Sequence, residues 1–297
     1  GKLSARLGYT IDELKLDAHT LRKLTLDTRV TGGELAVDRI AWEGDRGGRF
    51  TASGSLRPVS ETSAMMKLQF AGRDMIFGFP ALTEQELRRL PQYDLEGVLQ
   101  ARGATVRELA AGANGYLRLM AGKGRIRASG FRLLTNDFIE QLLETVNPLA
   151  TRDPYTKLKC AVVLAGIENG RVVGEPFLVS SSDRLNVYAN ADIDLRRERL
   201  DVTFNTVPQR GLGLSVSSLI NPYVKLTGTL AAPLLLLDPG QTIIEGTTTV
   251  VTGGLNIIAR TFRDRYLSGK DPCGEAHLQN DERISALEEK YGKPPIE

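Results

Sequence analysis

The sequence is poor in the side chains on which most enzyme chemistry depends. Its 297 residues include two histidines, two cysteines and one tryptophan. A Ser-His-Asp triad or a zinc site would have to be built around His19 or His277, and neither belongs to a standard zinc-ligand motif. The Gly-x-Ser-x-Gly motif of many hydrolases is also missing. We therefore expect no catalytic residues, no metal site and no cofactor, and a protein that is not an enzyme.

The charge balance and the small number of aromatic residues argue against nucleic-acid binding. The chain has 38 basic and 36 acidic side chains, a net charge of +2, and only 6% aromatic residues. It therefore offers neither a strong positive field nor many rings on which bases could stack. No apolar run, Leu234–Leu237 included, approaches the ~20 residues that a transmembrane helix needs. The chain opens in mid-pattern at Gly1–Ser4, and we expect it to be part of a longer protein.

The two cysteines, Cys160 and Cys273, lie far apart and form no Cys-x-x-Cys pair. Two unrelated buried thiols are one interpretation. The other is a single disulfide that closes a long loop, which requires an oxidising compartment. Their spacing alone does not decide between the two.

The dominant pattern in the sequence is an alternation of apolar and polar residues with a period of two. Leu24, Leu26 and Val30 share one face of a predicted strand. A longer alternation covers residues 185–195, with Tyr188 on the face that we expect to meet solvent. Tight turns separate such segments, a bulge is predicted near Asp38–Arg39, and a hairpin is predicted around Gly122–Gly124. This rhythm predicts a mainly β fold, a long antiparallel β-meander with a few short amphipathic helices.

The predicted helices are few. Thr83 and Thr105 each begin a capping-box pattern that favours a short helix. Residues 136–146 and 254–267 each carry an apolar stripe at helical spacing, which is typical of helices that pack on a core. One more helix is predicted near residues 285–290, within a Pro- and charge-rich tail.

Many of the strands are apolar on one side only, and a sheet must bury such a face. A second sheet could pack on it, the sheet could close on itself, or it could curl into a groove that holds an apolar ligand. The few helices cannot cover the whole face. Lipid is the natural ligand for such a groove, because burial of an acyl chain contributes roughly 0.8 kcal/mol per methylene. The candidate lipid-binding residues are Leu24, Leu26, Phe50, Met66, Leu68, Phe70, Leu185, Val187, Ile193, Leu195, Val202 and Phe204.

Several segments in order resemble the C-terminal region of AsmA-like proteins. The similarity begins near Leu95 with LEGVLQARGATVRELAAGANGYLRL and a helix that ends in Asn147-Pro148. It continues through CAVVLAGIENGRV, through YANADIDLRRERLDV, where Ala191 stands in place of the usual glycine, and through VKLTGTLAAPLLLLDP. DPCGEA resembles the family's terminal cysteine segment, so roughly residues 95–276 are covered.

The resemblance implies a periplasmic protein of the Gram-negative cell envelope, anchored in the inner membrane by an N-terminal helix that is absent here. It also implies a β structure folded like a taco around an apolar groove. Members are implicated in moving phospholipid between the inner and outer membranes, and some in outer-membrane protein assembly. In that compartment a Cys160–Cys273 disulfide is expected.

Phospholipid is therefore the partner that we expect, with lipid transport in support of outer-membrane biogenesis as the function. The alternative is a docking module for an outer-membrane or periplasmic protein, with the helices at 136–146 and 254–267 as the contact. The expected domain organisation is one β-groove module over residues 1–270, with the AsmA-like region from about residue 95. A loosely ordered tail would follow over residues 271–297.

Overall fold

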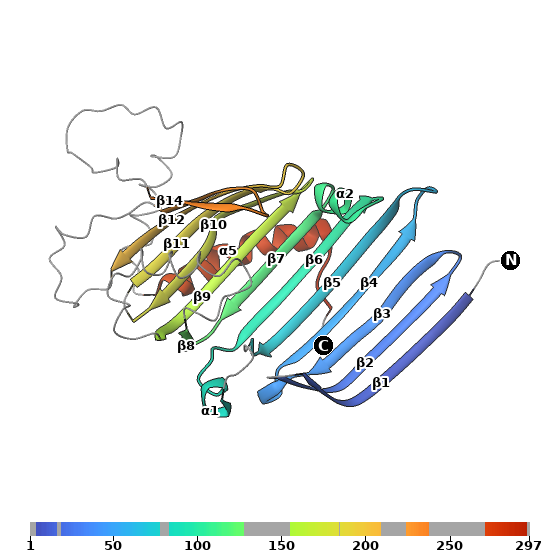
Figure 1. The fold of residues 1–297 in the computed structure, drawn as a ribbon, viewed down its shortest axis with the longest axis horizontal. Coiled ribbons are helices and arrows are strands. Elements are labelled where there is room, and N and C mark those ends of the chain that lie inside the picture. The colour runs from blue at the N-terminus through green and yellow to red at the C-terminus, as the bar shows by residue number, and fades with distance from the viewer. Residues whose placement is uncertain are drawn as a thin grey trace.

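The computed structural model describes residues 4–16, 19–77, 83–127, 155–183, 185–208, 224–237 and 271–295. They form one antiparallel sheet of 14 strands, with β1 and β14 at its two ends (Figure 1). The predicted mainly β, antiparallel meander is thus confirmed. The strands are β1 (Ser4–Leu16), β2 (His19–Thr31), β3 (Glu34–Glu43), β4 (Arg49–Pro58), β5 (Ala64–Met75), β6 (Tyr93–Gly103), β7 (Asn114–Ala121), β8 (Gly124–Arg127), β9 (Tyr155–Glu168), β10 (Arg171–Ser182), β11 (Leu185–Asp194), β12 (Arg199–Pro208), β13 (Val224–Gly228) and β14 (Pro233–Leu237).

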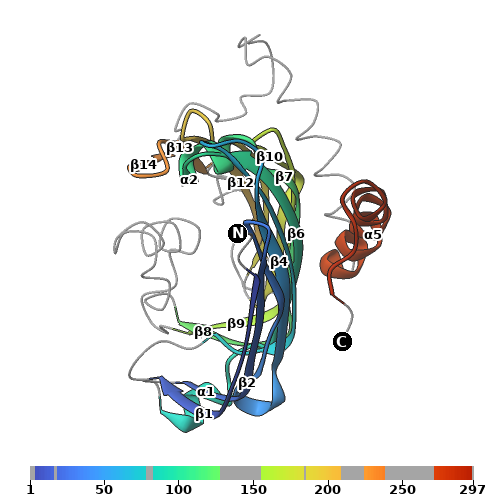
Figure 2. The same ribbon diagram turned by 90° about the vertical axis from the view of Figure 1, so that its right-hand side faces the viewer.

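The sheet is strongly curved, and the long helix α5 (Pro272–Tyr291) lies on its outer side (Figure 2). We call the outer side of the sheet the convex face and the inner side the concave face. Two shorter helices, α1 (Glu84–Leu87) and α2 (Val106–Ala111), lie at opposite ends of the strands that they connect, α1 between β5 and β6 and α2 between β6 and β7 (Figure 1). Both begin where the capping patterns predict, with the side chains of Thr83 and Thr105 accepting hydrogen bonds from backbone N–H groups.

The bulge predicted near Asp38–Arg39 is confirmed. Asp27 pairs with Arg39 and Thr28 pairs with Val37, so Asp38 is the extra residue on β3. The bulge restores a common phase, because Val37 and Ile40 both lie opposite residues of the same face of β4. The apolar residues on either side of Asp38 therefore reach the same side of the sheet.

The hairpin predicted around Gly122–Gly124 is wrong. β7 and β8 do not pair with each other, and both instead pair with β9, where Ala121 lies opposite Ala161 and Gly124 lies opposite Leu158. β7 and β8 thus pair with β9 one after the other in the same direction, with an interruption at the glycines. There, Gly122 N donates to Gln92 O at 2.9 Å, a bond outside the sheet. The glycine signal was correct for a break, but not for a reversal of the chain.

The tail predicted to be loosely ordered contains α5, which has 20 residues and not the short helix predicted near residues 285–290. Asp271 begins α5, since its carboxylate accepts a hydrogen bond from Gly274 N at 3.0 Å, and Pro272 follows at the first turn. The Asp-Pro pair is a standard helix start, so this signal was present in the sequence. The high charge of the segment concealed it.

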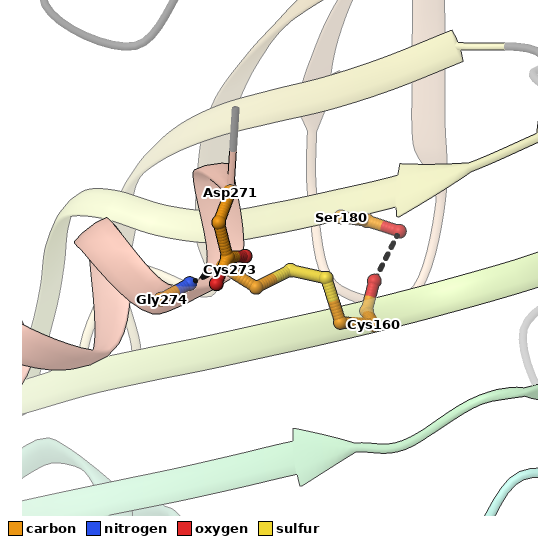
Figure 3. The surroundings of a disulfide bond; sticks show 5 residues. All are labelled: Cys160, Ser180, Asp271, Cys273 and Gly274. Atoms are coloured by element: carbon orange, nitrogen blue, oxygen red, sulfur yellow. Dashed lines mark hydrogen bonds between the residues drawn. A yellow bond between two sulfur atoms is a disulfide. The ribbon is translucent and has the colours of Figure 1, made fainter. Parts of the chain in front are cut away.

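A disulfide bond joins α5 to the sheet. Cys273 in the first turn of α5 is bonded to Cys160 on β9, across a sequence separation of 113 residues (Figure 3). The bond lies in a cluster of buried side chains from the helix and the convex face, made up of Val162, Val179, Tyr188, Cys273 and Ala276. The two cysteines are therefore one structural unit, the pairing that the family resemblance implied.

Charged groups hold the rest of α5 against the convex face. Glu96 on β6 is 3% exposed and lies between Arg73, at 2.7 Å, and Arg118. Arg118 also pairs with Asp281 of α5 at 3.1 Å. Near the end of the helix, Lys290 pairs with Glu168 at 2.5 Å. Because Glu96 is buried with charged partners on two sides, the helix covers an internal ion-pair network and not bare strands.

Tyr116 lies at the centre of this contact, fully buried, and its hydroxyl makes no hydrogen bond to any described residue. Burial, helped by the nearby charges of Glu288 and Glu96, raises the pKa of Tyr116 above the ordinary tyrosine value. The unfolded chain ionises Tyr116 first as the pH rises. This contribution to the free energy of unfolding is therefore complete at neutral pH and is lost at alkaline pH, from about pH 10 upward.

We expect Tyr116→Phe to leave the free energy of unfolding at neutral pH unchanged or to raise it by about 1 kcal/mol, because it removes a buried hydroxyl without a partner. The variant should also lose less stability than the parent chain between neutral pH and about pH 11. Urea unfolding at the two pH values measures both effects. Tyr9→Phe, at a tyrosine that is 59% exposed, is the control and should follow the parent chain.

Candidate functional site

The pairing register of the strands places apolar residues in continuous rows across the sheet. Residues directly opposite each other in an antiparallel pair point to the same side. One such row crosses the sheet from β3 to β12 without a polar residue. It consists of Trp42, Phe50, Gly72, Leu95, Leu119, Val163, Leu178, Ala189 and Phe204.

These rows lie on the concave face. Gln69 and Gln100 donate hydrogen bonds to the backbone of Lys293 and Tyr291, and both side chains belong to the alternate positions of β5 and β6. α5 and the segment after it therefore cover the face opposite to the apolar rows. Since α5 lies on the outer side of the curved sheet, the apolar rows line its inner side (Figure 2).

In the middle of the strands from β2 to β13, the described positions of the concave face carry no Asp, Glu, Lys, Arg or His side chain. In each range of strand residues, the concave positions are the first residue and every second residue after it. The ranges are 24–30, 35–37, 40–42, 50–56, 66–72, 95–101, 115–121, 161–167, 172–174, 178–180, 187–193 and 200–204, and residue 226 is added to them. Only Thr28 and Ser180 among them are polar.

The convex face is very different. It carries ion pairs such as Arg29–Asp38 at 3.0 Å, Arg171–Asp192 at 2.5 Å and Lys225–Asp201 at 2.7 Å. The guanidinium of Arg171 holds the pKa of Asp192 below its usual range. The separation of charge to one face and apolar groups to the other is thus maintained across nearly the whole sheet.

Ten of the twelve candidate residues occupy the concave strand positions given above, and the eleventh, Leu185, is paired with Pro208 in the same register of β11 and β12. The twelfth, Leu195, follows β11 and packs against a cluster that includes Ile167 and Val172 of the same face. The structure therefore brings all twelve positions to one side of the sheet. Their role in binding lipid stays a prediction.

The central part of the concave face was missed. Leu95, Leu99, Leu117, Leu119, Val163 and Leu178 line it, but the sequence analysis did not select them. The same period-two alternation marks residues 95–101, so the signal was available there. On β9 it was not, because both faces of that strand are apolar: Val163 is concave, whereas Val162 and Leu164 are buried on the convex side.

Tyr188, which the alternation placed on the solvent side, is 4% exposed because α5 covers it. Its face was predicted correctly, but no local pattern indicates that a helix from the far end of the chain packs there. The two amphipathic segments at 136–146 and 254–267 lie outside the described residues.

Aromatic side chains form a platform at one end of the concave face. The rings of Trp42 and Phe50 stack at 4.0 Å, and those of Phe50 and Phe70 stack at 6.5 Å. Phe70 lies over Gly97 of the neighbouring strand, where a Cβ atom would be 2.7 Å from Phe70 Cζ and 2.9 Å from Tyr116 O. Gly97 thus gives the Phe70 ring room to lie on the sheet.

We expect Gly97→Ala to lower the free energy of unfolding by about 1–3 kcal/mol, because the added methyl group must displace the Phe70 ring or the backbone of β7. Gly166→Ala is the matched control on β9. Its Cβ would meet no atom closer than 3.8 Å, so it should be near neutral. Urea unfolding of both variants tests the difference, and equal stabilities would show that Phe70 does not depend on Gly97.

The concave face is most open toward β1. The side chains of Leu7, Tyr9, Leu35 and Leu56 on β1, β3 and β4 are between 40% and 60% exposed. Toward the other end, Ala189, Ala191 and Val202 form a buried cluster with partly buried neighbours such as Phe204 and Leu226. The apolar surface accessible to a ligand is therefore greatest on the N-terminal strands.

Comparison with protein-family models, curated proteins and solved structures finds no match for the chain. Among the described residues, no helix is both long and apolar enough to cross a membrane. Groups of three or more potential metal ligands are likewise missing from that part of the chain. Functional inference therefore depends on the chemistry of the concave face itself.

Proposed function

We propose that the concave face is a lipid-binding groove, and that the protein conducts phospholipid between the inner and outer membranes in support of outer-membrane biogenesis. The observation that carries the proposal is the lack of any charged side chain at the mid-strand concave positions given above, from Leu24 to Leu226. Acyl chains require such a surface, because a charge facing them would have to lose its hydration without a partner. A polar ligand or a polar protein surface would not require a face without charges.

The dimensions support conduction as well as binding. Neighbouring strands lie about 4.8 Å apart, so the rows from β2 to β13 extend over about 50 Å along the sheet. The acyl chains of one leaflet fill about half of a hydrocarbon core that is ~30 Å thick. Several lipids can therefore lie one behind another along the groove. Transfer between neighbouring positions requires little change of environment, since no charged side chain interrupts the middle of the face.

The compartment belongs to the same proposal. A disulfide between Cys160 and Cys273 suits an oxidising environment such as the periplasm. The resemblance to the C-terminal region of AsmA-like proteins points in the same direction and adds an inner-membrane anchor in the full-length protein. Both considerations support a place in the Gram-negative cell envelope.

Native mass spectrometry of the purified chain tests lipid binding, and the expected result is a co-purifying phospholipid that extraction identifies. Photo-crosslinking locates it. A photoreactive residue at Val187, on the concave face, should capture phospholipid, whereas one at Val173, on the convex face of β10, should not. Val173 is a better control than Tyr188, which α5 covers. Equal capture at both positions, or none at either, would contradict a lipid-lined concave groove.

A further inference from the structure

Strand β10 carries a bulge of two extra residues. Val173 pairs with Gly166 of β9, and Leu178 pairs with Val163, so five steps along β10 match three steps along β9. The pairing of β10 with β11 is interrupted at the same place. A bulge redirects the side chains beside it. The bulge therefore decides on which face of the sheet Phe177, the residue before Leu178, lies.

Phe177 lies on the concave face. The alternation that puts Val173 and Val179 on the convex face would place it on that side as well. It packs instead against both hydrophobic clusters of the concave side, which are Ala101, Ala113, Ala165, Ile167 and Val172 in one and Ala189, Ala191 and Val202 in the other. Gly174 leaves room for this turn, since a Cβ atom there would be 2.7 Å from both Cα and Cβ of Phe177. The bulge thus moves an aromatic ring from the outside of the sheet into the groove.

The concave face of these strands is buried in one half and accessible in the other. On β9, Ala165 is buried and Ala161 is half-buried, and on β11, Ala191 is buried and Val187 is half-buried. The side chains that pack over the buried half include Leu109 of α2, Phe177 and Leu195. The accessible floor therefore narrows to about half of its width where the groove crosses β9, β10 and β11.

We propose that Phe177 is a wall of the lipid path, and that it confines acyl chains to the half of the concave face that contains Ala161 and Val187. The inference rests on the proposed lipid groove and names a residue that shapes it. A phenylalanine ring suits the role, because it is large, rigid and uncharged. The side chains under it, such as Ala165 and Ala191, are small. Without the ring, an acyl chain would therefore find an open apolar space there.

Helix α5 supports this wall from the outside of the sheet. Arg283 Nη1 donates a hydrogen bond to Glu175 O, in the bulge, at 2.8 Å. The backbone of the bulge is thus attached to the helix on the convex face, while its aromatic ring lies on the concave face. Arg283 is therefore a positioning residue, which acts on the lipid path only through Phe177.

A phospholipid with a photoreactive group in one acyl chain maps the path. It is delivered to the full chain from phosphatidylcholine vesicles, and mass spectrometry identifies the residues that it labels. In the parent chain Val187 should be labelled, whereas Ala191, which is 4% exposed, should not. Phe177→Ala should raise the labelling of Ala191 several-fold relative to Leu68 on β5, because the ring no longer covers it. Phe177→Leu, a milder change for the fold, should give a smaller rise in the same direction.

Val179→Ala is the matched control, because Val179 is 1% exposed on the convex face of the same strand. It should leave the labelling pattern unchanged. Arg283→Ala should raise the labelling of Ala191 and Arg283→Lys should restore the parent pattern, which a purely stabilising role of Arg283 would not produce. Circular dichroism verifies the fold of each variant. Folded Phe177 variants with the parent pattern would overturn this proposal and leave the lipid groove standing, whereas a chain labelled at no concave residue would overturn both.

Discussion

Replacing Leu68 by aspartate is expected to remove most of the bound phospholipid while leaving the protein folded. Leu68 lies in the middle of β5 on the concave face, opposite Gly54 and Leu99. Gly54 leaves room beside it, and the side chain is only half-buried, so an aspartate fits without displacing its neighbours. A carboxylate at this position would be enclosed by acyl chains without a hydrogen-bond donor. A penalty of about 3 kcal/mol corresponds to about a hundredfold weaker lipid binding.

The matched control is Lys67→Asp, one residue earlier on the same strand. Its side chain is exposed on the convex face, opposite Ser55 and Gln100, and the substitution changes the charge by even more. Lipid content measured by native mass spectrometry should therefore fall for Leu68→Asp and remain unchanged for Lys67→Asp. Thermal unfolding of both variants verifies the fold. Equal lipid content in a folded Leu68→Asp variant would show that acyl chains do not occupy this part of the groove.

Breaking the bond between Cys160 and Cys273 is expected to produce the largest loss of stability of any change considered. The cross-link joins residues 113 positions apart, and loops of about 100 residues correspond to about 4.7 kcal/mol in the chain-entropy description. The double variant Cys160→Ser with Cys273→Ser should therefore unfold at much lower urea concentration than the parent chain. The parent chain should approach the same midpoint when a reductant is added.

The region of the protein that loses stability when the bond is broken is also predictable. α5 retains the Lys290–Glu168 pair at 2.5 Å and a hydrogen bond from Arg283 to Glu175 O at 2.8 Å, but its first turn loses its covalent attachment. Amide exchange should therefore accelerate most near Gly274, while β3 and β4, far from the first turn of the helix, should change little. Reductant should have no further effect on the double variant. If reductant did not change the unfolding midpoint of the parent chain, the bond would contribute nothing to the free energy of unfolding.

The faces of strands that are apolar on one side only could be predicted from the sequence, whereas those of strands that are apolar on both sides could not. The alternation of Leu24 and Leu26, or of Val202 and Phe204, identifies a face because the residues between them are polar. β9 offers no such contrast, since Val162, Val163 and Leu164 are all apolar and are divided between a groove and a helix contact. Long-range packing decided their roles, and no local pattern encodes it.

Turn chemistry shows the same limit. Gly122 and Gly124 indicate a break in a strand, but whether the chain then reverses or continues depends on β9, which comes more than thirty residues later. α5 was underestimated for a related reason: its stability comes from Cys273, Arg118 and Tyr188, and two of those three lie on the sheet. The helix start at Asp271-Pro272 could be predicted from the sequence, whereas the surface on which the helix packs could not.

The meander itself implies that the protein is a quasi-one-dimensional array of strands. Almost every strand pairs with the strands next to it in the chain, and α5 packs mainly against β6, β7, β9 and β10. The loss or gain of a hairpin near β1 would thus leave all other pairings and the disulfide intact, as in repeat proteins. Each hairpin adds about 10 Å. The span of the apolar path can therefore evolve in fixed steps without redesign of the rest of the molecule.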